Sequence, residues 1–276
     1  MPTVLISSLS YSSGTAIARN LASKIDYEFV GDELLREASV KYGIEKRKLE
    51  AAFRSMPLLF GMSTARRKRR IAFAQATLTE KLLDDNIVYH GPFGQFMVKG
   101  ISHVLSVRIH ARLDDRIAER TRRENIDRRE AERAISKEDQ QRRMIAKTVF
   151  GKDDDETDYF DLAINTSQMD VDTAVEVIFE TVNRRRYLPM TYSMQRMRDV
   201  ALTSKALAEL TDIDPDVEVE AENGNIQVRT RMQGGARKRT RREEEIKKRL
   251  SGWDEVENLE VTVIHVVLDR IKASLR

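Results

Sequence analysis

The chain of 276 residues contains no cysteine. This absence excludes disulfides, thiolate catalysis and cysteine-based zinc sites together. Glycine and proline are also scarce, with 12 and 5 residues, whereas apolar residues make up 41% of the chain. Because that much apolar surface offsets the entropy of ordering, we expect a folded and mostly helical protein.

Long apolar runs are missing as well. The longest late run, residues 261–268, is far shorter than the ~20 residues that span a bilayer. Residues 1–9 carry no positive charge, and their apolar stretch is too short for a signal peptide. We therefore predict a cytoplasmic protein without a transmembrane segment.

A strong net charge of one sign is the third absence. The 48 Lys and Arg residues nearly balance 45 Asp and Glu residues, which leaves a net charge of +3. Bases gather at residues 66–70, but a helix spreads such a run around its axis, so a solvated helix surface is the favoured interpretation. We therefore do not expect nucleic acid as a partner.

Short apolar segments typical of buried strands alternate with helical patterns over the first 185 residues. We expect strands at residues 3–7, 27–30, 86–90, 103–110 and 160–165. We expect helices at residues 15–22, 33–38, 45–83 with a break near Met56 and Pro57, 113–124, 127–148 and 171–184, and an acidic loop at 151–158. This alternation predicts an α/β fold with a parallel sheet covered by helices on both faces.

The composition changes at residues 184–189, after which a smaller unit is expected. Asn223 and Gly224 are the signal of a type I′ hairpin between two strands. The expected elements are a helix at 193–210, strands at 217–222 and 226–230, a helix at 240–250, a strand at 259–268 and an optional terminal helix. We predict domains at residues 1–185 and 197–276, joined by a linker at 186–196.

Small residues fill the turn between the first strand and the first helix. On the phosphate-loop template G-x-x-x-x-G-K-[ST], Thr15 takes the hydroxyl position that holds Mg²⁺, whereas Ser8 and Ser13 replace glycines and Gly14 replaces the lysine. Such loops bind phosphate because backbone N–H groups converge at a helix N-terminus. A serine-rich turn with Ser12 or Ser13 as helix cap is the alternative.

Five segments, taken in order, resemble the cytidylate kinase-like family, which is related to nucleoside monophosphate kinases. They are residues 6–32, 88–91, 113–120, 139–143 and 159–166. The resemblance covers about residues 3–183. It implies a P-loop NTPase-type fold that holds ATP and Mg²⁺, with a nucleoside monophosphate or other small phosphate acceptor under a helical lid.

The resemblance also implies roles for particular residues. The phosphate-binding residues would be Ser12, Ser13, Gly14 and Thr15, with Thr15 also near Mg²⁺. The catalytic lid residues would be Arg116, Arg120, Arg142, Arg143 and Asp139, with Asp32 and Gly91 on the substrate side. Phosphoryl transfer uses several arginines because it depends on charge neutralisation. The same arginines also fit an ordinary exposed helix face, and the two aspartates fit a helix cap and a salt-bridge partner.

Two features bear on catalysis. Gly14 lacks the ammonium group of the lysine, an absence that the resemblance implies for much of the family, so a lid arginine is expected to substitute for it. Pro92 follows Gly91 where the kinases and many of these relatives have an arginine. Loss of one preorganised donor typically costs ~10²–10³ in rate. Two hypotheses therefore stand: an ATP-dependent nucleoside monophosphate kinase, or a catalytically degenerate nucleotide-binding regulatory protein that signals through its C-terminal domain.

The C-terminal unit resembles a BON domain, a small module of the order helix, two strands, helix, strand. The hairpin at Asn223 and the pattern Gly252, Val256, Asn258 before the last strand carry the resemblance. It implies a protein partner or an anionic lipid, for which residues 237–242 supply a basic loop worth about 1 kcal/mol per base near a charged surface. Residues 243–245 are acidic and neutralise this loop locally, so a protein partner is favoured.

Overall fold

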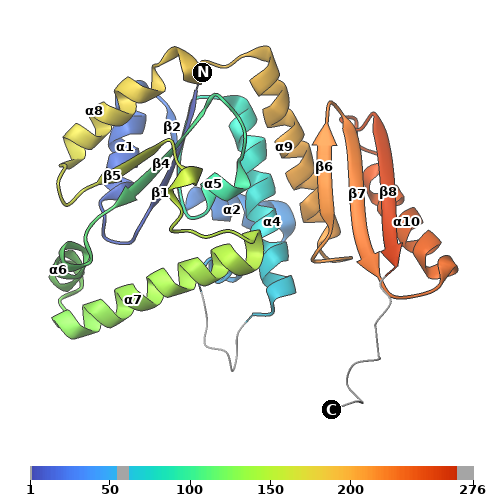
Figure 1. Cartoon of the computed structure of the whole chain (residues 1–276), viewed down its shortest axis with the longest axis horizontal. Coiled ribbons are helices and arrows are strands. Elements are labelled where there is room, and N and C mark those ends of the chain that lie inside the picture. The colour runs from blue at the N-terminus through green and yellow to red at the C-terminus, as the bar shows by residue number, and fades with distance from the viewer. Residues whose placement is uncertain (1, 55–61, 266–276) are drawn as a thin grey trace.

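The computed structural model describes residues 2–54 and 62–265. Its larger sheet has five parallel strands in the order β2-β3-β1-β4-β5 (Figure 1). The strands are β1 (Thr3–Ser8), β2 (Glu28–Val30), β3 (Ile87–His90), β4 (Val104–His110) and β5 (Leu162–Asn165). The predicted α/β fold with a parallel sheet is confirmed.

Helices cover both faces of this sheet. On one face, α1 (Gly14–Ile25) and α8 (Val171–Val182) bury Ile17, Leu21 and Ile178 against β1, β3 and β4. On the other face, Leu78 of α4 (Thr64–Lys81) and Phe93 join a second core. Burial on both faces explains why the strands are short, nearly continuous apolar runs. The remaining helices on this side are α2 (Glu33–Tyr42), α3 (Lys46–Glu50) and α5 (Gly94–Met97).

Two charged helices beyond β4 are joined by a short turn into a helical hairpin and pack against each other. They are α6 (Leu113–Glu124) and α7 (Arg128–Ile145), and α7 ends in a π-helical turn, Ala146–Phe150. Their small apolar contact is made by Ile117, Ala131 and Ile135, packed against Tyr11. This hairpin is placed beside the loop between β1 and α1, where the lid was expected.

The C-terminal unit contains α9 (Thr191–Leu210), β6 (Glu218–Glu222), β7 (Asn225–Met232), α10 (Ala236–Leu250) and β8 (Asn258–His265). In its sheet, β6 is antiparallel and β8 parallel to β7. Asn223 and Gly224 have φ of 48° and 77°, which fits the predicted type I′ turn. Residues 237–242 form the first turns of α10, so the predicted basic loop is wrong. Arginine and lysine are good helix formers, and no glycine or proline interrupts them.

Helix α9 belongs to both cores of the molecule. Met197 packs with the sheet of the larger unit and Ala208 packs beside α4, whereas Leu202, Ala206 and Leu210 face the smaller sheet. The division at residues 186–196 remains a prediction, and the structure adds that the chain crosses it through a 20-residue helix shared by both units. The expected break at Met56 and Pro57 and the terminal helix lie outside the described residues.

Candidate functional site at the N-terminus of α1

A cavity of about 490 Å³ lies at the carboxyl ends of β1 and β3, beside the N-terminus of α1. In an open parallel sheet, ligands bind outside the carboxyl ends of the strands, where the strand order reverses. Here the chain runs from β1 to strands on one side of it and then crosses to β4 on the other. The lining consists of residues 8–16, Phe53, Arg54, His90, Pro92, Phe93, Arg123, Glu138, Asp139 and Arg142.

The loop before α1 turns sharply into the helix. Tyr11 and Ser13 both have a φ of 61°, in the left-handed region. Ser12 is buried, and its hydroxyl donates to the carbonyl oxygen of Leu9 at 2.6 Å, which holds the loop in place. The first helical hydrogen bond runs from the amide of Ile17 to Ser13. The backbone amides before Ile17 therefore have no partner within the helix, and they lie at the cavity wall. The exposed Thr15 is one of these residues.

Gly14 occupies the template position of the lysine, and the structure leaves no room there for a side chain. A Cβ on Gly14 would lie 2.3 Å from the Cβ of Ser8 and 3.1 Å from Nε2 of His90. These two neighbours are joined by a hydrogen bond of 2.9 Å between Ser8 Oγ and His90 Nε2. The missing lysine is thus replaced by a packed Ser8–His90 pair, which the sequence pattern did not indicate.

Arg116 and Asp139 form a bidentate ion pair behind the cavity wall. Two guanidinium nitrogens of Arg116 each lie 2.8 Å from one carboxylate oxygen of Asp139, and Nε donates to the carbonyl oxygen of Ser10 at 2.8 Å. Arg116 is only 2% exposed and does not line the cavity, whereas Asp139 does. The pair ties α6, α7 and the loop together. Arg120 is held similarly, by Glu138 at 2.7 Å and against the ring of Tyr11.

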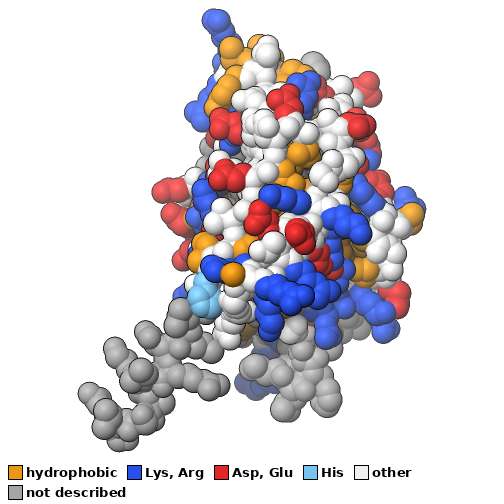
Figure 2. Space-filling view, turned by 90° about the vertical axis from the view of Figure 1, so that its right-hand side faces the viewer, with side chains coloured by type: hydrophobic (Ala, Val, Ile, Leu, Met, Phe, Trp, Pro, Cys, Tyr) orange, Lys and Arg blue, Asp and Glu red, His pale blue; other side chains and the backbone are white. Residues whose placement is uncertain are grey.

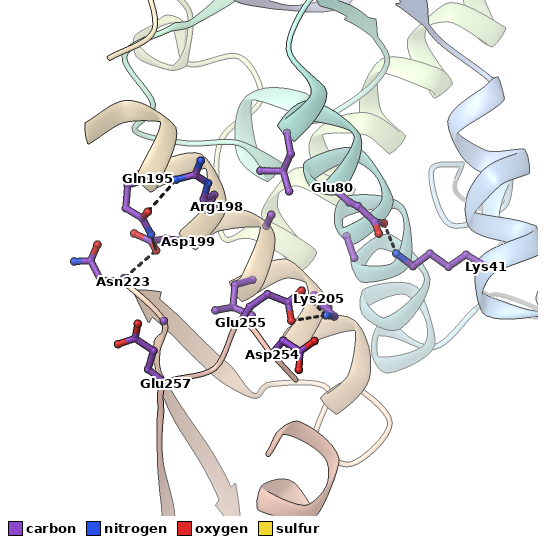
Figure 3. Close-up of a pocket in the computed structure, with 15 residues that line it drawn as sticks. Lys41, Glu80, Gln195, Arg198, Asp199, Lys205, Asn223, Asp254, Glu255 and Glu257 are labelled. Carbon is purple, nitrogen blue, oxygen red and sulfur yellow. Dashed lines mark hydrogen bonds and ion pairs between the residues drawn. The ribbon is translucent and has the colours of Figure 1, made fainter. Parts of the chain in front are cut away.

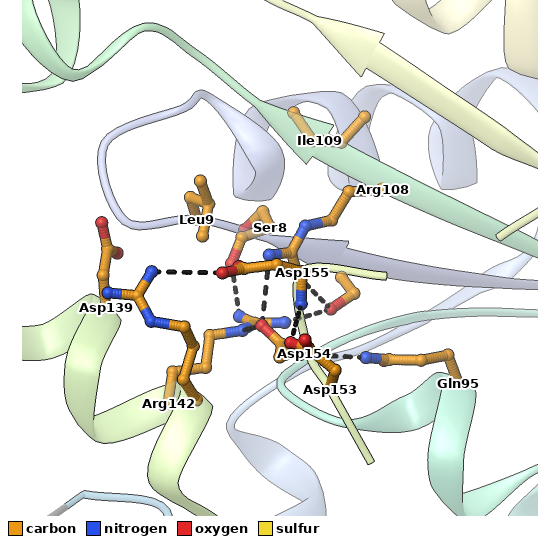
Figure 4. Close-up of polar contacts among 12 residues, drawn as sticks. Ser8, Leu9, Gln95, Arg108, Ile109, Asp139, Arg142, Asp153, Asp154 and Asp155 are labelled. Atoms are coloured by element: carbon orange, nitrogen blue, oxygen red, sulfur yellow. Dashed lines mark hydrogen bonds and ion pairs between the residues drawn. The ribbon is translucent and has the colours of Figure 1, made fainter. Parts of the chain in front are cut away.

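Arg142 reaches from α7 to the end of β1 (Figure 4). It donates to the carbonyl oxygen of Ser8 at 2.7 Å and pairs with Asp154, which is 1% exposed. Asp154 also binds Arg108 of β4 at 3.1 Å and Gln95 at 3.2 Å. Burial lowers the pKa of Arg108, and the neighbouring Arg142 lowers it further. Sequence reasoning missed this cluster, although a lone arginine within the apolar strand β4 was its signal.

Three other predicted residues lie away from the cavity lining. Arg143 points outward with its side chain 50% exposed and pairs with Asp155. Asp32 is exposed at the N-cap position of α2. The amide of Gly91 donates to the carbonyl oxygen of Ile6 at 3.2 Å, which holds the glycine against β1. Its neighbours His90 and Pro92 line the cavity, whereas Gly91 does not. Of the predicted residues, the cavity brings together Ser12, Ser13, Gly14, Thr15, Asp139 and Arg142, and it adds the unpredicted Arg54 and Arg123.

His90 is neutral near pH 7. Burial lowers its pKa to about 4, and the nearby cation of Arg142 contributes to the shift. The cavity therefore combines a helix N-terminus, a neutral imidazole and three arginines with the carboxylates Glu138 and Asp139. Of these arginines, Arg142 is paired with Asp154 and Arg123 with Glu119. This combination suits a ligand with several negative charges, such as a phosphate chain.

Metal ligands are sparse around this cavity. Within residues 2–54 and 62–265, no group of three or more His, Asp or Glu side chains is arranged to hold a metal ion. Mg²⁺ is usually bound by one or two protein oxygens together with substrate phosphates, so the exposed hydroxyl of Thr15 fits such an ion. Across the same described residues, no helix is long and apolar enough to cross a membrane.

A larger cavity, of about 590 Å³, lies between the two units (Figure 3). Lys41 of α2 and Glu80 of α4 pair on one side of it. On the other side, Lys205 of α9 pairs with Glu255 at 2.9 Å. It lies away from the carboxyl ends of the large sheet. Its lining has more carboxylates than cations, which does not suit a phosphate group.

The parallel strand order and the loop leading into α1 define a kinase-like α/β protein with a P-loop-type nucleotide-binding fold. The chain belongs to the cytidylate kinase-like family, whose sequence model matches residues 3–168. A search of the curated proteins found no match. The family match does not include the C-terminal unit.

Solved structures with a similar fold include a protein from Eubacterium ventriosum described as uncharacterized. It has 18% identity and a TM-score of 0.51, and the match covers 67% of this chain and 100% of that one. Shikimate kinases from Acinetobacter baumannii and Bacteroides thetaiotaomicron match with 13% and 10% identity and TM-scores of 0.37 and 0.39. These cover 66% of this chain and 93% and 99% of theirs. At such identities the likeness to the Eubacterium ventriosum protein shows the fold alone. The likeness to the two shikimate kinases is looser and carries no argument about function.

Proposed function

We propose that this chain binds ATP with its phosphates at the N-terminus of α1 and transfers a phosphoryl group to a nucleoside monophosphate or another small phosphate acceptor. The observation that carries the proposal is the opening of α1 into the cavity, at residues 12–16. A helix N-terminus carries about half a positive charge and presents amides without helical partners. Both features favour a phosphate group.

The residues around the loop fit ATP and Mg²⁺. When bound, ATP supplies the phosphoryl group. Thr15 would hold the metal ion through its hydroxyl. Arg54, Arg123 and Arg142 line the space, although Arg123 is paired with Glu119 and Arg142 with Asp154. Phosphoryl transfer depends mainly on positioning and charge neutralisation, so these cations are suited to orient the phosphates. The loop and lid would be held in place by Arg116, Arg120 and Asp139. The family resemblance alone implies a substrate-side role for Asp32 and Gly91 and a lid role for Arg143.

Binding without efficient turnover is the second candidate function, and two observations favour it. The side chain of Ser8 closes the lysine position at Gly14. In addition, Arg116 is already neutralised by Asp139. A nucleotide-binding regulatory protein with this site would report ligand binding through α9, which is shared with the C-terminal unit.

Calorimetric titration of the full chain with MgATP, followed by a coupled assay of ADP release, separates these functions. CMP, dCMP, AMP and UMP serve as acceptors. We expect Thr15→Ala to weaken MgATP binding about tenfold, whereas Thr173→Ala, an exposed threonine in the first turn of α8, leaves it unchanged. Steady turnover excludes the regulatory function, and binding without turnover supports it. If no nucleotide binds, the nucleotide proposal is wrong.

We also propose that residues 197–276 form a BON-like module that contacts a protein partner. The element order α9, β6, β7, α10, β8 supports this assignment. Lys and Arg side chains gather at one end of the face that α10 covers (Figure 2). In the first two turns of α10, Arg237, Lys238 and Arg241 are exposed. Cosedimentation of the chain with phosphatidylserine vesicles, against neutral vesicles, would instead support an anionic lipid.

A further inference from the structure

His90 lies beside Gly14, the position at which the usual phosphate loop has its lysine. Its ring comes from the carboxyl end of β3, whose register pairs His90 with Ile6 of β1, two residues before Ser8. Nε2 of His90 lies 3.1 Å from the position of a Cβ on Gly14, the first residue of α1. Of the described residues that line the cavity, His90 is the one histidine. An anion at the N-terminus of α1 would therefore lie beside this imidazole.

The groups that face His90 come from two helices and the turn after β2. Arg142 of α7 and Arg19 of α1 disfavour the imidazolium, Asp32 at the start of α2 favours it, and burial disfavours it most. These influences hold its pKa near 4 and leave the ring uncharged at neutral pH. The lysine of the usual loop brings its charge permanently, whereas His90 does not.

A bound phosphate chain reverses this balance. Each negative charge a few ångströms from the ring favours the charged form, and the same charges offset the repulsion from Arg142 and Arg19. Ser8 lies within 2.9 Å of Nε2 and can exchange its role, donating to the neutral ring and accepting from the protonated one. The proton comes from the solvent, and no covalent bond changes.

We propose that His90 is the phosphate-binding group that stands in for the missing lysine, and that it takes up a proton when a polyphosphate binds. Ser8 is the positioning residue that keeps the ring beside α1. This inference rests on the proposed binding of ATP phosphates in the cavity. It makes phosphate affinity greater at low pH, because binding raises the pKa of His90 and affinity falls as the pH rises through the liganded value.

Calorimetry of MgATP and of inorganic tripolyphosphate tests the proposal at pH 7. Each titration is run in two buffers with different ionisation enthalpies, and the difference in heat gives the number of protons taken up. We expect roughly half a proton to one proton more for the wild-type chain than for His90→Gln, which keeps a neutral donor of similar reach. The dissociation constant should rise by up to about tenfold per pH unit in the wild type relative to this variant. His110→Gln, outside the cavity lining, is the matched control and should behave as the wild type.

The possible results separate the two proposals. If both ligands bind with the same proton uptake and pH dependence in wild type and His90→Gln, the inference is wrong while the binding function stands. If neither ligand binds, both fall. Proton NMR of the wild-type imidazoles needs no variant: the His90 resonance should titrate near pH 4 without ligand and well above it with tripolyphosphate. An unchanged titration would overturn the inference even if His90→Gln fails to fold.

Discussion

Two groups of arginines in this chain look alike in sequence and differ in the structure. Arg116 and Arg142 lie on the charged helices α6 and α7, and their side chains are 3% and 14% exposed, with carboxylates fixed beside them. Arg237 and Arg241 lie on the equally charged helix α10 and face the solvent. The difference comes from what each arginine meets. The two buried arginines contact the serine loop and are each paired with a carboxylate, Asp139 or Asp154, whereas the two on α10 meet water. A basic helix therefore indicates a site only where the fold places carboxylates or a ligand against it.

Breaking the buried pair should have the largest effect. We expect Arg116→Met to lower the free energy of unfolding by about 3 kcal/mol, because Asp139 loses its partner in a mostly buried position. Arg237→Met should change it by less than about 0.5 kcal/mol. Urea unfolding of both variants measures the contrast. The double variant Arg116→Met with Asp139→Leu should recover part of the loss. If Arg116→Met and Arg237→Met lower the free energy of unfolding equally, the comparison is wrong.

The neutral, buried state of His90 should make the protein sensitive to acid. Its folded pKa of about 4 lies below the usual 6.5, so the unfolded chain binds a proton first as the pH falls. The contribution of His90 to the free energy of unfolding is therefore constant above pH 6.5. It decreases by up to about 3 kcal/mol as the pH falls from 6.5 to 4. His90→Gln should remove this part of the pH dependence. Urea unfolding at pH 7, 5.5 and 4.5 checks it, and parallel curves for wild type and variant would contradict the assignment.

The packing at the start of α1 can be tested by adding back a side chain. Gly14→Ala should destabilise the chain by about 1–3 kcal/mol, because the new methyl group overlaps the side chain of Ser8. Ser8→Gly together with Gly14→Ala should recover most of this loss. Thermal unfolding of the single and double variants measures the coupling. Additive effects would show that Ser8 is not the obstacle.

The exposed cluster on α10 should respond weakly and in the opposite direction. The first turn of this helix holds bases and no acidic residue, although the helix dipole favours negative charge there. Arg237→Glu should therefore stabilise the chain by about 0.3–1 kcal/mol at low salt, and less at high salt. Lys247→Glu near the other end of α10 should be destabilising, because it removes the pair with Glu243. Thermal unfolding at two salt concentrations distinguishes these outcomes.

Much of the fold was predictable because its signals are local. The parallel sheet follows from short apolar segments between helices, and α6 spans residues 113–124 as its pattern predicts. The hairpin at Asn223 and Gly224 is also a local signal, since both residues tolerate positive φ. The basic segment at residues 237–242 is helical and not the predicted loop, because its arginines and lysine have a high helix propensity.

The sequence by itself determined the α/β alternation, the serine loop before α1 and the absence of a lysine at Gly14. Only the tertiary structure decided which arginines face the cavity. Arg142 lines it and pairs with Asp154, whereas Arg116 is held behind the wall by Asp139. It also decided why no lysine stands at Gly14, since Ser8 and His90 arrive there from two different strands. Helical spacing places a side chain on a face, and the partner that the face meets is chosen by the packing of the whole chain.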